Sequence, residues 1–234
     1  MYEAVYANPD EEGSIRRLVE TASAYGFDGV VVRNATEGAL VDELLATREA
    51  ASIDVVDAGE ITASEPQRAS GSVGNVRHSR TTVIVRGGSP VLNRFAVENE
   101  KVDVLSRPMA GEGDVNHVLA KAAVANGVCI EFDLGPVLRE SGGRRVRVLQ
   151  SLGKLFEIAD YYDAPYVVSA TPADRFELRA PRELAAVGEQ IGLSREWIEE
   201  GLAEWGRLAA RNRRIQSDSF IEPGVERGRY DEDR

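Results

Sequence analysis

Seven short runs of strand-forming residues alternate with amphipathic helical windows up to about residue 212, and this rhythm strongly constrains the fold. Several of the runs are apolar on both faces, which is typical of buried parallel strands. No stretch rich in Pro, Gly and Ser is long enough to separate two domains. The pattern therefore predicts one α/β domain over residues 1–212. The predicted strands are residues 2–7, 29–33, 53–58, 81–86, 102–105, 128–133 and 166–169.

The helical windows between these runs carry start signals that agree with their periodicity. Asn8-Pro9, followed by two carboxylates, predicts a first helix that ends near Gly26. Ser89-Pro90, Pro181 and Ser194 predict three further helix starts. The longest window places one apolar stripe on a helix: Val148, Leu149, Leu152, Leu155, Phe156, Ala159 and Tyr162.

Repeated strand-then-helix steps with short connections favour a TIM-like (β/α) barrel, possibly distorted. An open doubly wound sheet is disfavoured because no Gly-x-Gly-x-x-Gly follows any strand. Two segments do not follow the rhythm. Residues 60–80 are polar and rich in Ser, Gly and Ala, which predicts a long mobile loop, and residues 213–234 are predicted to form a flexible tail.

The charge balance is acidic, with 39 Asp and Glu residues against 28 Lys and Arg. The three lysines are Lys101, Lys121 and Lys154, so 25 of the basic residues are arginine. This lysine deficit favours a protein adapted to molar salt, and the alternative is an ordinary acidic cytosolic protein. Residues 60–107 carry 5 acidic and 7 basic residues, so this segment would tolerate an anionic partner.

Other features exclude several classes of protein. The single cysteine, Cys129, and the two histidines have no zinc-binding spacing. No run approaches 18 consecutive apolar residues, and the N-terminus lacks the pattern of a signal peptide. We therefore expect a soluble, cytoplasmic protein with no structural zinc and no membrane partner.

Arginines follow several predicted strands at the end where (β/α) barrels carry their functional sites. Arg33, Arg86 and Arg107 follow three strands, while Arg179 and Arg182 flank a helix start after the last strand. Guanidinium groups that converge on one face favour an anionic ligand, because they make paired contacts to phosphate. The alternative for each arginine is a helix cap or an ion pair with a carboxylate.

A hydrolytic barrel would need several His and Asp ligands around a metal. An enzyme alternative uses Asp103, His117 and Asp133 as metal ligands in a metal-dependent phosphoesterase. We expect only one of Glu131 and Asp133 to face the barrel centre. The run Gly87-Gly88-Ser89-Pro90 is either a phosphate loop or a tight turn into a capped helix.

A series of motifs occurs in a fixed order between residues 85 and 193. The motifs are Gly87-Gly88, Asn93-Arg94-Phe95-Ala96-Val97-Glu98, Val102-Asp103-Val104-Leu105-Ser106-Arg107-Pro108, Asn116-His117-Val118-Leu119-Ala120-Lys121, Ile130-Glu131-Phe132-Asp133-Leu134-Gly135-Pro136-Val137-Leu138, Arg179-Ala180-Pro181-Arg182-Glu183-Leu184, Gly188 and Ile191-Gly192-Leu193. Together they resemble the ribonuclease P protein component 3 family of archaea, which is related to a thirty-kilodalton subunit of the eukaryotic enzyme. Many members of that family have an acid where this chain has Ser89.

The resemblance implies a TIM-like barrel distantly related to metal-dependent phosphoesterase barrels. It also implies a subunit of the ribonucleoprotein that removes the 5′ leader of precursor tRNA. In that family the RNA carries the catalytic magnesium, so no cofactor and no catalytic residue are expected on this chain. The implied partners are ribonuclease P RNA, ribonuclease P protein component 2 and other ribonuclease P proteins, with precursor tRNA contacted indirectly.

The resemblance and the arginine pattern together predict contacts with RNA phosphates. The predicted contacts are Arg33, Arg68, Arg77, Arg80, Arg86, Arg107, Lys121, Arg179 and Arg182. A further alternative is a scaffold whose arginines bind acidic proteins.

Overall fold

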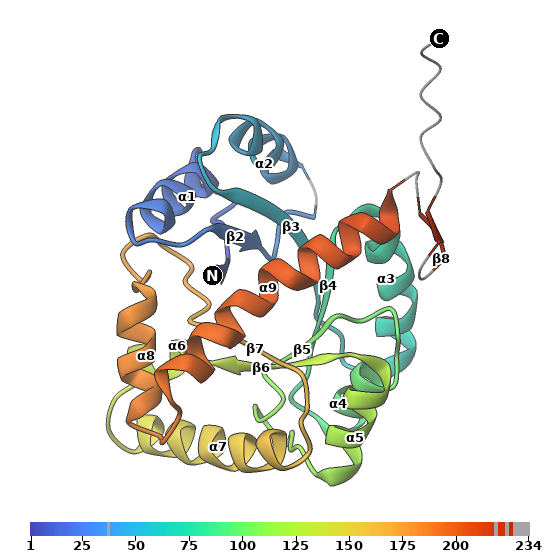
Figure 1. The fold of residues 1–234 in the computed structure, drawn as a ribbon, viewed down its shortest axis with the longest axis vertical. Helices are drawn as coiled ribbons and strands as arrows, with labels where there is room; N and C mark the ends of the chain where they lie inside the picture. Colours follow the sequence, from blue (N-terminus) through green and yellow to red (C-terminus); the bar gives the residue numbers. More distant parts are fainter. Residues whose placement is uncertain (37, 218–219, 223–224, 227–234) are drawn as a thin grey trace.

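The computed structural model describes residues 1–36, 38–217, 220–222 and 225–226, and its centre is a parallel sheet whose spatial order follows the chain order. The pairing starts with Tyr2 beside Gly29 and continues strand by strand to Ser169 beside Asp133. Helices surround this sheet, and the TIM-like architecture is confirmed (Figure 1). The strands are β1 (Tyr2–Val5), β2 (Gly29–Val32), β3 (Asp54–Ile61), β4 (Thr82–Arg86), β5 (Val104–Ser106), β6 (Cys129–Asp133) and β7 (Tyr166–Ser169).

The first and last strands meet at a seam, so the barrel is nearly closed. No ladder joins β1 to β7 in the described part of the chain. Instead, Tyr6 N donates to Pro172 O at 2.9 Å, and Ala170 N donates to the side-chain Oε1 of Glu3 at 2.9 Å. A buried carboxyl group therefore replaces part of the missing strand pairing.

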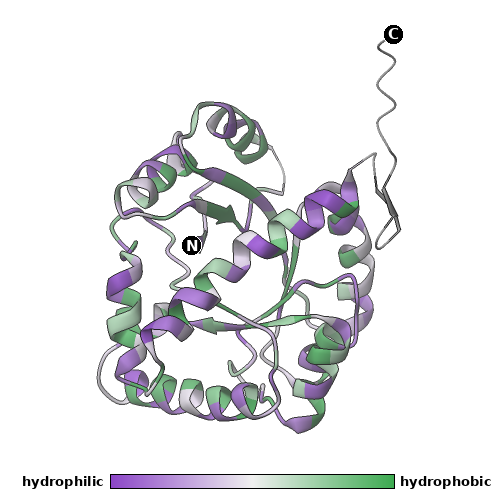
Figure 2. Cartoon of the chain, in the orientation of Figure 1, coloured by the Kyte–Doolittle hydropathy of each residue, from purple (hydrophilic) through white to green (hydrophobic). Residues whose placement is uncertain are grey.

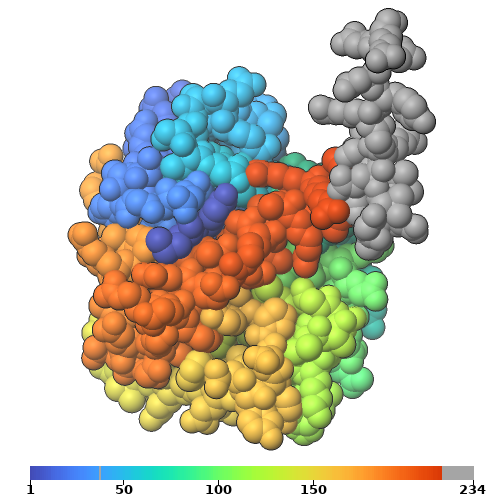
Figure 3. Space-filling view, in the orientation of Figure 1, coloured from blue at the N-terminus to red at the C-terminus, as the bar shows by residue number. Residues whose placement is uncertain are grey.

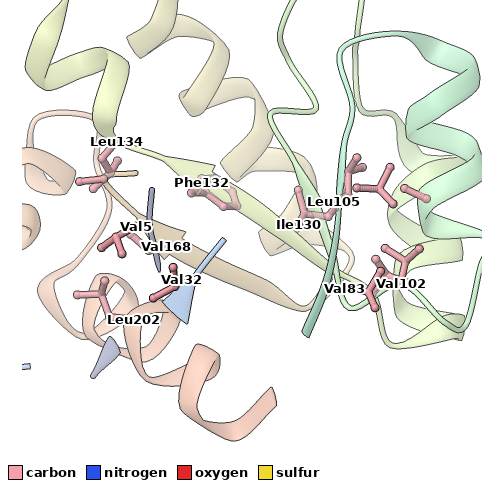
Figure 4. Close-up of a cluster of buried hydrophobic side chains, with 14 of the residues drawn as sticks. Val5, Val32, Val83, Val102, Leu105, Ile130, Phe132, Leu134, Val168 and Leu202 are labelled. Carbon is pink, nitrogen blue, oxygen red and sulfur yellow. The ribbon is translucent and has the colours of Figure 1, made fainter. Parts of the chain in front are cut away.

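Apolar side chains fill the space between the strands and the outer helices. Figure 4 shows part of this layer, including Ile130 and Phe132 of β6, Val168 of β7 and Leu202 of the last helix. The helices are α1 (Ser14–Ala24), α2 (Ala39–Ala50), α3 (Pro66–Ser79), α4 (Pro90–Val97), α5 (His117–Asn126), α6 (Gly135–Arg139), α7 (Gly142–Tyr161), α8 (Pro181–Glu189) and α9 (Arg195–Gln216).

Helix α9 covers the end of the barrel at which the strands begin. Arg211 donates to Asp103 at 2.8 Å, Asn212 to Thr81 O at 2.9 Å and Arg213 to Asp54 at 2.7 Å. The three acceptor residues all lie at or just before the first residue of a strand. In Figures 1 and 3 the orange-red α9 crosses the front of the molecule, and in Figure 2 its residues alternate between polar and apolar.

The barrel interior is apolar beneath α9. Trp205 is completely buried there, and its indole Nε1 donates to Val168 O at 2.9 Å. Leu208 and Ala209 join it against inward-facing strand residues: Ala4, Val31, Val56, Ala58, Ile84, Val104, Cys129 and Val167. The first end of the barrel is therefore sealed by hydrophobic packing.

The prediction of a mobile loop over residues 60–80 is wrong. Strand β3 extends to Ile61, and helix α3 occupies most of the remainder. Pro66 at the start of α3 favours helix initiation, and Ala69 and Val73 are buried four residues apart. These buried side chains, with the partly buried Val76, hold a polar, glycine-containing helix against the barrel.

The start of α1 also differs from the prediction. Asn8 Oδ1 accepts from Asp10 N at 3.1 Å in a turn, and the helix begins only at Ser14. The predicted starts at Pro90, Pro181 and Ser194 are confirmed, with Ser194 accepting from a backbone N–H of α9.

The last helix passes the predicted domain boundary at residue 212 and ends at Gln216. Beyond it, β8 (Phe220–Glu222) pairs antiparallel with β9 (Val225–Glu226). Positions 218, 219, 223, 224 and 227–234 of the predicted tail lie outside the described residues. None of the described helices combines the length and apolarity needed to cross a membrane.

Candidate nucleic-acid interface

The barrel interior changes from apolar to polar at the carboxyl end of the strands. In each of β1 to β7, an apolar inward-facing residue is followed two positions later by a polar residue, and side chains two apart share a face. We call these seven polar residues the mouth ring. They are Tyr6, Arg33, Glu60, Arg86, Ser106, Glu131 and Ser169. The alternation of side chains along the strands therefore places a polar site at the carboxyl ends of the strands, where (β/α) barrels carry their functional sites.

Arg33 connects several members of the mouth ring through hydrogen bonds and is completely buried. Its Nη1 and Nη2 donate to Glu131 at 2.5 and 3.1 Å, Nη2 also donates to Ser106 Oγ at 2.8 Å, and Nε lies 3.3 Å from Glu60. Burial lowers the pKa of Arg33, but the charges of Glu131 and Glu60 raise it well above its ordinary value. The prediction that Arg33 contacts RNA is therefore corrected, because its guanidinium is enclosed and already paired.

Tyr6, Glu60 and Arg86 form the adjoining part of the ring. Arg86 donates to Glu60 at 2.9 Å and to the Tyr6 hydroxyl at 3.0 Å, while that hydroxyl donates to Glu60. Burial, opposed by the charge of Arg33 and reinforced by Glu60, raises the pKa of Tyr6 to about 12. Burial also raises the pKa of Glu60, but Arg33 and hydrogen bonds from Arg86 and Tyr6 hold it below its ordinary value. At neutral pH, Glu60 is therefore ionised and Tyr6 keeps its proton.

Glu131 and Asp133 both face the barrel centre, which corrects the expectation that only one would. They are two residues apart on β6, and such residues share a face. Asp133 Oδ1 accepts from Thr171 Oγ1 and Gly135 N, both at 2.9 Å. Burial and the charge of Glu131 raise the pKa of Asp133, whereas Arg107 opposes this shift.

Two strained residues lie on either side of Asp133. Arg107 and Thr171 adopt left-handed backbone conformations, with φ of 49° and 46°, which cost about 1–2 kcal/mol in residues other than glycine. Arg107 Nε lies 3.4 Å from Asp133 Oδ2, and Thr171 donates to the same carboxylate. Strain that converges on one buried carboxylate favours a functional role for this part of the mouth.

A groove of about 530 Å³ opens beside Asp133, between the loop that follows β5 and helix α7. We call it the α7 groove. Three arginines line it together with apolar side chains and three acidic residues: Arg107, Arg144, Arg147, Glu131, Asp133 and Glu140. Sequence reasoning did not assign Arg144 and Arg147 to the RNA site. The available signal was the run Gly-Gly-Arg-Arg-Val-Arg at a helix start with no acid in its first turn.

Arg179 and Arg182 lie at the start of α8, which follows β7 and so belongs to the mouth side of the barrel. Arg179 donates to Phe176 O at 2.9 Å and to Leu178 O at 2.7 Å, and it is only half-buried. Arg182 is exposed on the first helical turn. These two predicted residues therefore lie on the same side of the barrel as Arg86 and Arg107.

The other four predicted contacts are not part of the mouth ring. Arg77 is held by Asp103 and by the backbone, and Arg80 donates to carbonyl groups of residues 36 and 79. The ammonium of Lys121 lies 5.5 Å from the centre of the Tyr162 ring. Arg68 is exposed on α3. The structure thus does not gather all nine predicted residues into one site.

The run Gly87-Gly88-Ser89-Pro90 forms the tight turn into a capped helix rather than an open phosphate loop. Ser89 Oγ accepts from Leu92 N at 3.4 Å. Asn93 is completely buried, accepts from Gly88 N at 3.1 Å and donates to Pro108 O at 2.8 Å. A Cβ at Gly87 would lie 2.2 Å from Asn93 Oδ1, so this glycine is needed for close approach. The motif fixes two mouth loops to each other.

The three residues of the enzyme alternative do not come together. Asp103 precedes β5 and is bound by Arg77 and Arg211, whereas Asp133 ends β6 at the opposite end of the barrel. A five-residue strand spans roughly 16 Å. His117 begins α5 outside the barrel. Across the described ranges, no three His, Cys, Asp or Glu side chains are grouped as metal ligands.

Comparison with known proteins identifies the family. The RNase P subunit p30 family matches residues 1–217. The chain belongs to this ribonuclease P family. It is 55% identical to ribonuclease P protein component 3 of Halorubrum lacusprofundi, with both chains covered completely. It is 51% identical to the component 3 of Haloarcula marismortui, with 96% of each chain covered. The predicted resemblance is confirmed, and these relatives come from halophilic archaea.

Solved structures agree with the barrel architecture of the ribonuclease P family. A chain from the cryo-electron microscopy structure of archaeal ribonuclease P with mature tRNA gives a TM-score of 0.81 at 24% identity, covering 99% of this chain and all of that one. Histidinol phosphate phosphatase from Lactococcus lactis gives a TM-score of 0.52 at 9% identity, and the match covers 82% of this chain and 94% of that one. Identities this low establish the fold alone, and they confirm the predicted likeness to phosphoesterase barrels.

Proposed function

We propose that this chain is a protein subunit of ribonuclease P that supports the catalytic RNA as it removes the 5′ leader of precursor tRNA. The observation that carries this proposal is the family match over residues 1–217, together with relatives named ribonuclease P protein component 3 that cover the whole chain. The activity belongs to the holoenzyme, and no catalytic role is assigned to a side chain of this protein.

The surface proposed to meet RNA is the edge of the barrel mouth. Arg86 and Arg107 are about one-third exposed there, and Arg179 and Arg182 extend the edge along α8. Arg144 and Arg147 extend it along the α7 groove. Arg33 instead positions the network beneath them. Arg68, Arg77, Arg80 and Lys121 stay predicted RNA contacts.

Several partner assignments stay predictions. Ribonuclease P protein component 2 and other ribonuclease P proteins are the proposed protein partners, with precursor tRNA met through the RNA. Magnesium is proposed to act on the RNA rather than on this chain. The cytoplasm is the proposed location.

High salt would weaken the electrostatic attraction between this surface and RNA. A protein with 6–10 phosphate contacts loses roughly 10³–10⁵ in affinity between 50 and 200 mM salt, and at 1 M the Debye length is only about 3 Å. Binding in molar salt must then depend on contact hydrogen bonds, which arginine forks provide better than lysine does. This offers a physical reason for 25 arginines and three lysines.

Reconstitution tests the proposed function directly. Cleavage of precursor tRNA by ribonuclease P RNA is measured at limiting magnesium and high salt, with component 2 alone and with component 2 plus this chain. We expect stimulation that needs both proteins. If the chain neither stimulates cleavage nor associates with component 2, the proposal fails. Metal-dependent phosphatase activity of the isolated chain would then support the enzyme alternative.

A paired substitution tests the proposed surface. Arg107→Ala with Arg179→Ala removes two guanidinium groups from the mouth, and we expect RNA affinity to fall about tenfold or more in low salt, with a shallower salt dependence. The matched control is Arg94→Ala with Arg207→Ala, since both arginines are exposed and pair within their own helices. Equal RNA affinity of the two double variants would remove the mouth arginines from the interface.

A further inference from the structure

The α7 groove has the size and the wall composition of a ligand site. Its volume of about 530 Å³ lies within the roughly 300–1,000 Å³ of small-molecule pockets. Met109 and Pro108 form an apolar wall on the side of the β5 loop, and Val148, Leu152 and Leu155 form another along α7. The groove can hold one flat apolar group but is too small for a nucleic-acid duplex.

The charged rim of the groove favours an anion. Arg144 is 74% exposed, and its ion-pair contact to Glu140 is long at 3.8 Å. Arg147 is also exposed and lines the groove beside it. Both arginines lie in the first turns of α7, where the helix dipole disfavours cations. The first turn itself holds no acidic residue, and Glu140, which also lines the groove, precedes the helix. A phosphate at this rim would satisfy the arginines and the helix end together.

An unused hydrogen-bond acceptor lies at the inner wall of the groove, with almost no surface exposed to solvent. Asp133 is only 7% exposed and lines the groove, and its Oδ2 has no hydrogen-bond partner within the described chain. Arg107 Nε lies 3.4 Å away, but it too lacks a hydrogen bond. A buried acceptor without a donor is costly. The groove is therefore complementary to a ligand that brings a donor to Asp133 while its anionic part stays at the rim.

We propose that the α7 groove holds one unpaired ribonucleotide. Its base lies between the apolar walls, its phosphate contacts Arg144 and Arg147, and its 2′-hydroxyl donates to Asp133 Oδ2. This inference rests on the proposed RNA-binding function and specifies what part of an RNA the mouth takes. Unpaired nucleotides are the usual targets of sequence-specific RNA contacts, and the 2′-hydroxyl distinguishes RNA from DNA.

An acidic protein segment fits the same groove less well. Its carboxylates would suit Arg144 and Arg147 but would approach the carboxylates of Glu131 and Asp133 on the wall, and like charges close together repel. An acidic side chain also brings no donor to Asp133. Ribose supplies a donor and phosphate supplies the charge, with the two groups adjacent in one nucleotide.

The test uses the reconstituted complex and chemical acylation of RNA 2′-hydroxyl groups. With the wild-type chain present, we expect one unpaired nucleotide to lose reactivity about tenfold relative to the complex lacking this chain. Asp133→Asn keeps an oxygen for Thr171 and Gly135 but replaces the free acceptor with a donor. We expect this variant and Arg144→Ala with Arg147→Ala to restore the reactivity, and Arg94→Ala with Arg207→Ala to leave the nucleotide protected.

A second measurement does not depend on the folding of the Asp133 variant. Met109→Cys carries a benzophenone label, and Cys129 stays unlabelled because it is buried. We expect a crosslink to a single unpaired stretch of RNA. A crosslink to a protein subunit, or to duplex RNA, overturns the inference, as does protection that Asp133→Asn does not change. If precursor-tRNA cleavage is still stimulated in those cases, the proposed function stands and only the groove assignment fails.

Discussion

The two ends of the barrel are closed by opposite kinds of chemistry. At the first end, α9 inserts Trp205 into an apolar interior, where its single polar atom donates to Val168 O. At the mouth, Arg33 is equally buried but is surrounded by Glu131, Glu60 and Ser106. Both arrangements exclude water from the centre, yet one does so by packing and the other by charge pairing.

This difference indicates which end of the barrel can bind a ligand. At the α9 end the interior is filled by apolar side chains, whereas the mouth leaves Asp133 Oδ2 without a hydrogen-bond partner among the described residues. A buried ion-pair network is no better for stability than a well-packed apolar core. The polar mouth is therefore better explained by what it presents to a ligand than by what it adds to the fold.

The largest expected effect comes from breaking the charge pairing at the mouth. Arg33→Leu leaves Glu131 and Glu60 buried without their shared cation, and we expect a loss of about 3–5 kcal/mol in the free energy of unfolding at pH 7. In the wild type, the pKa of Glu60 is held low, so its pairing stabilises the fold above the unfolded-state pKa and is lost on acidification. The difference between variant and wild type should shrink from pH 7 to pH 4 in urea unfolding.

Trp205→Ala is the matched control at the other end. Removing a fully buried indole also costs about 3–5 kcal/mol, but this loss comes from a cavity. It should not depend on pH over the same range. If both variants show the same pH dependence, the two ends do not differ as described.

The next effect tests the seam between β1 and β7. Glu3 is completely buried, and burial, opposed by hydrogen bonds from Ala170 N and Ala4 N, raises its pKa to about 8. The folded state therefore keeps a proton that the unfolded chain loses near pH 4.5, so stability falls as pH rises between about 4.5 and 8. Glu3→Gln removes this titration. Between pH 6 and pH 8, the free energy of unfolding of the variant should therefore rise by about 2 kcal/mol relative to that of the wild type.

Urea unfolding across this pH range provides the measurement. The wild-type free energy of unfolding should decline with pH more steeply than that of the variant. Parallel curves would mean that Glu3 is ionised in the folded chain and that the seam is held by a charged group.

The barrel could be predicted from sequence because strand and helix periodicity are local signals. All seven strands and the caps at Ser89 and Ser194 were found in this way. Residues 60–80 were missed because α3 is held by a few apolar anchors against the barrel, a tertiary effect that its Ser- and Gly-rich composition conceals. The turn at Asn8 was mistaken for a cap because a side-chain oxygen serves both structures.

The site could be predicted only in part. Strand ends identified Arg33, Arg86 and Arg107, but sequence could not tell that Arg33 would find two buried carboxylates across the barrel. Glu60 carries the same alternation signal as the arginines, yet sequence reasoning did not assign it to the site. The α7 groove depends on how a distant helix packs beside the β5 loop, which no local pattern specifies.

The smallest expected effect separates exposed from enclosed charge pairs. Arg207 on α9 pairs with Glu200 and Glu204 and is half exposed, so Arg207→Ala should cost only about 0.2–1 kcal/mol. Salt screens such pairs, and this cost should approach zero between 0.1 and 1 M KCl. Arg86 is bound to Glu60, whose side chain is only 4% exposed, so the cost of Arg86→Ala should be larger and should persist in 1 M KCl. Measured by urea unfolding at both salt concentrations, an equal decline for the two variants would contradict the enclosed character of the mouth, because only solvent-exposed charges are screened so fully.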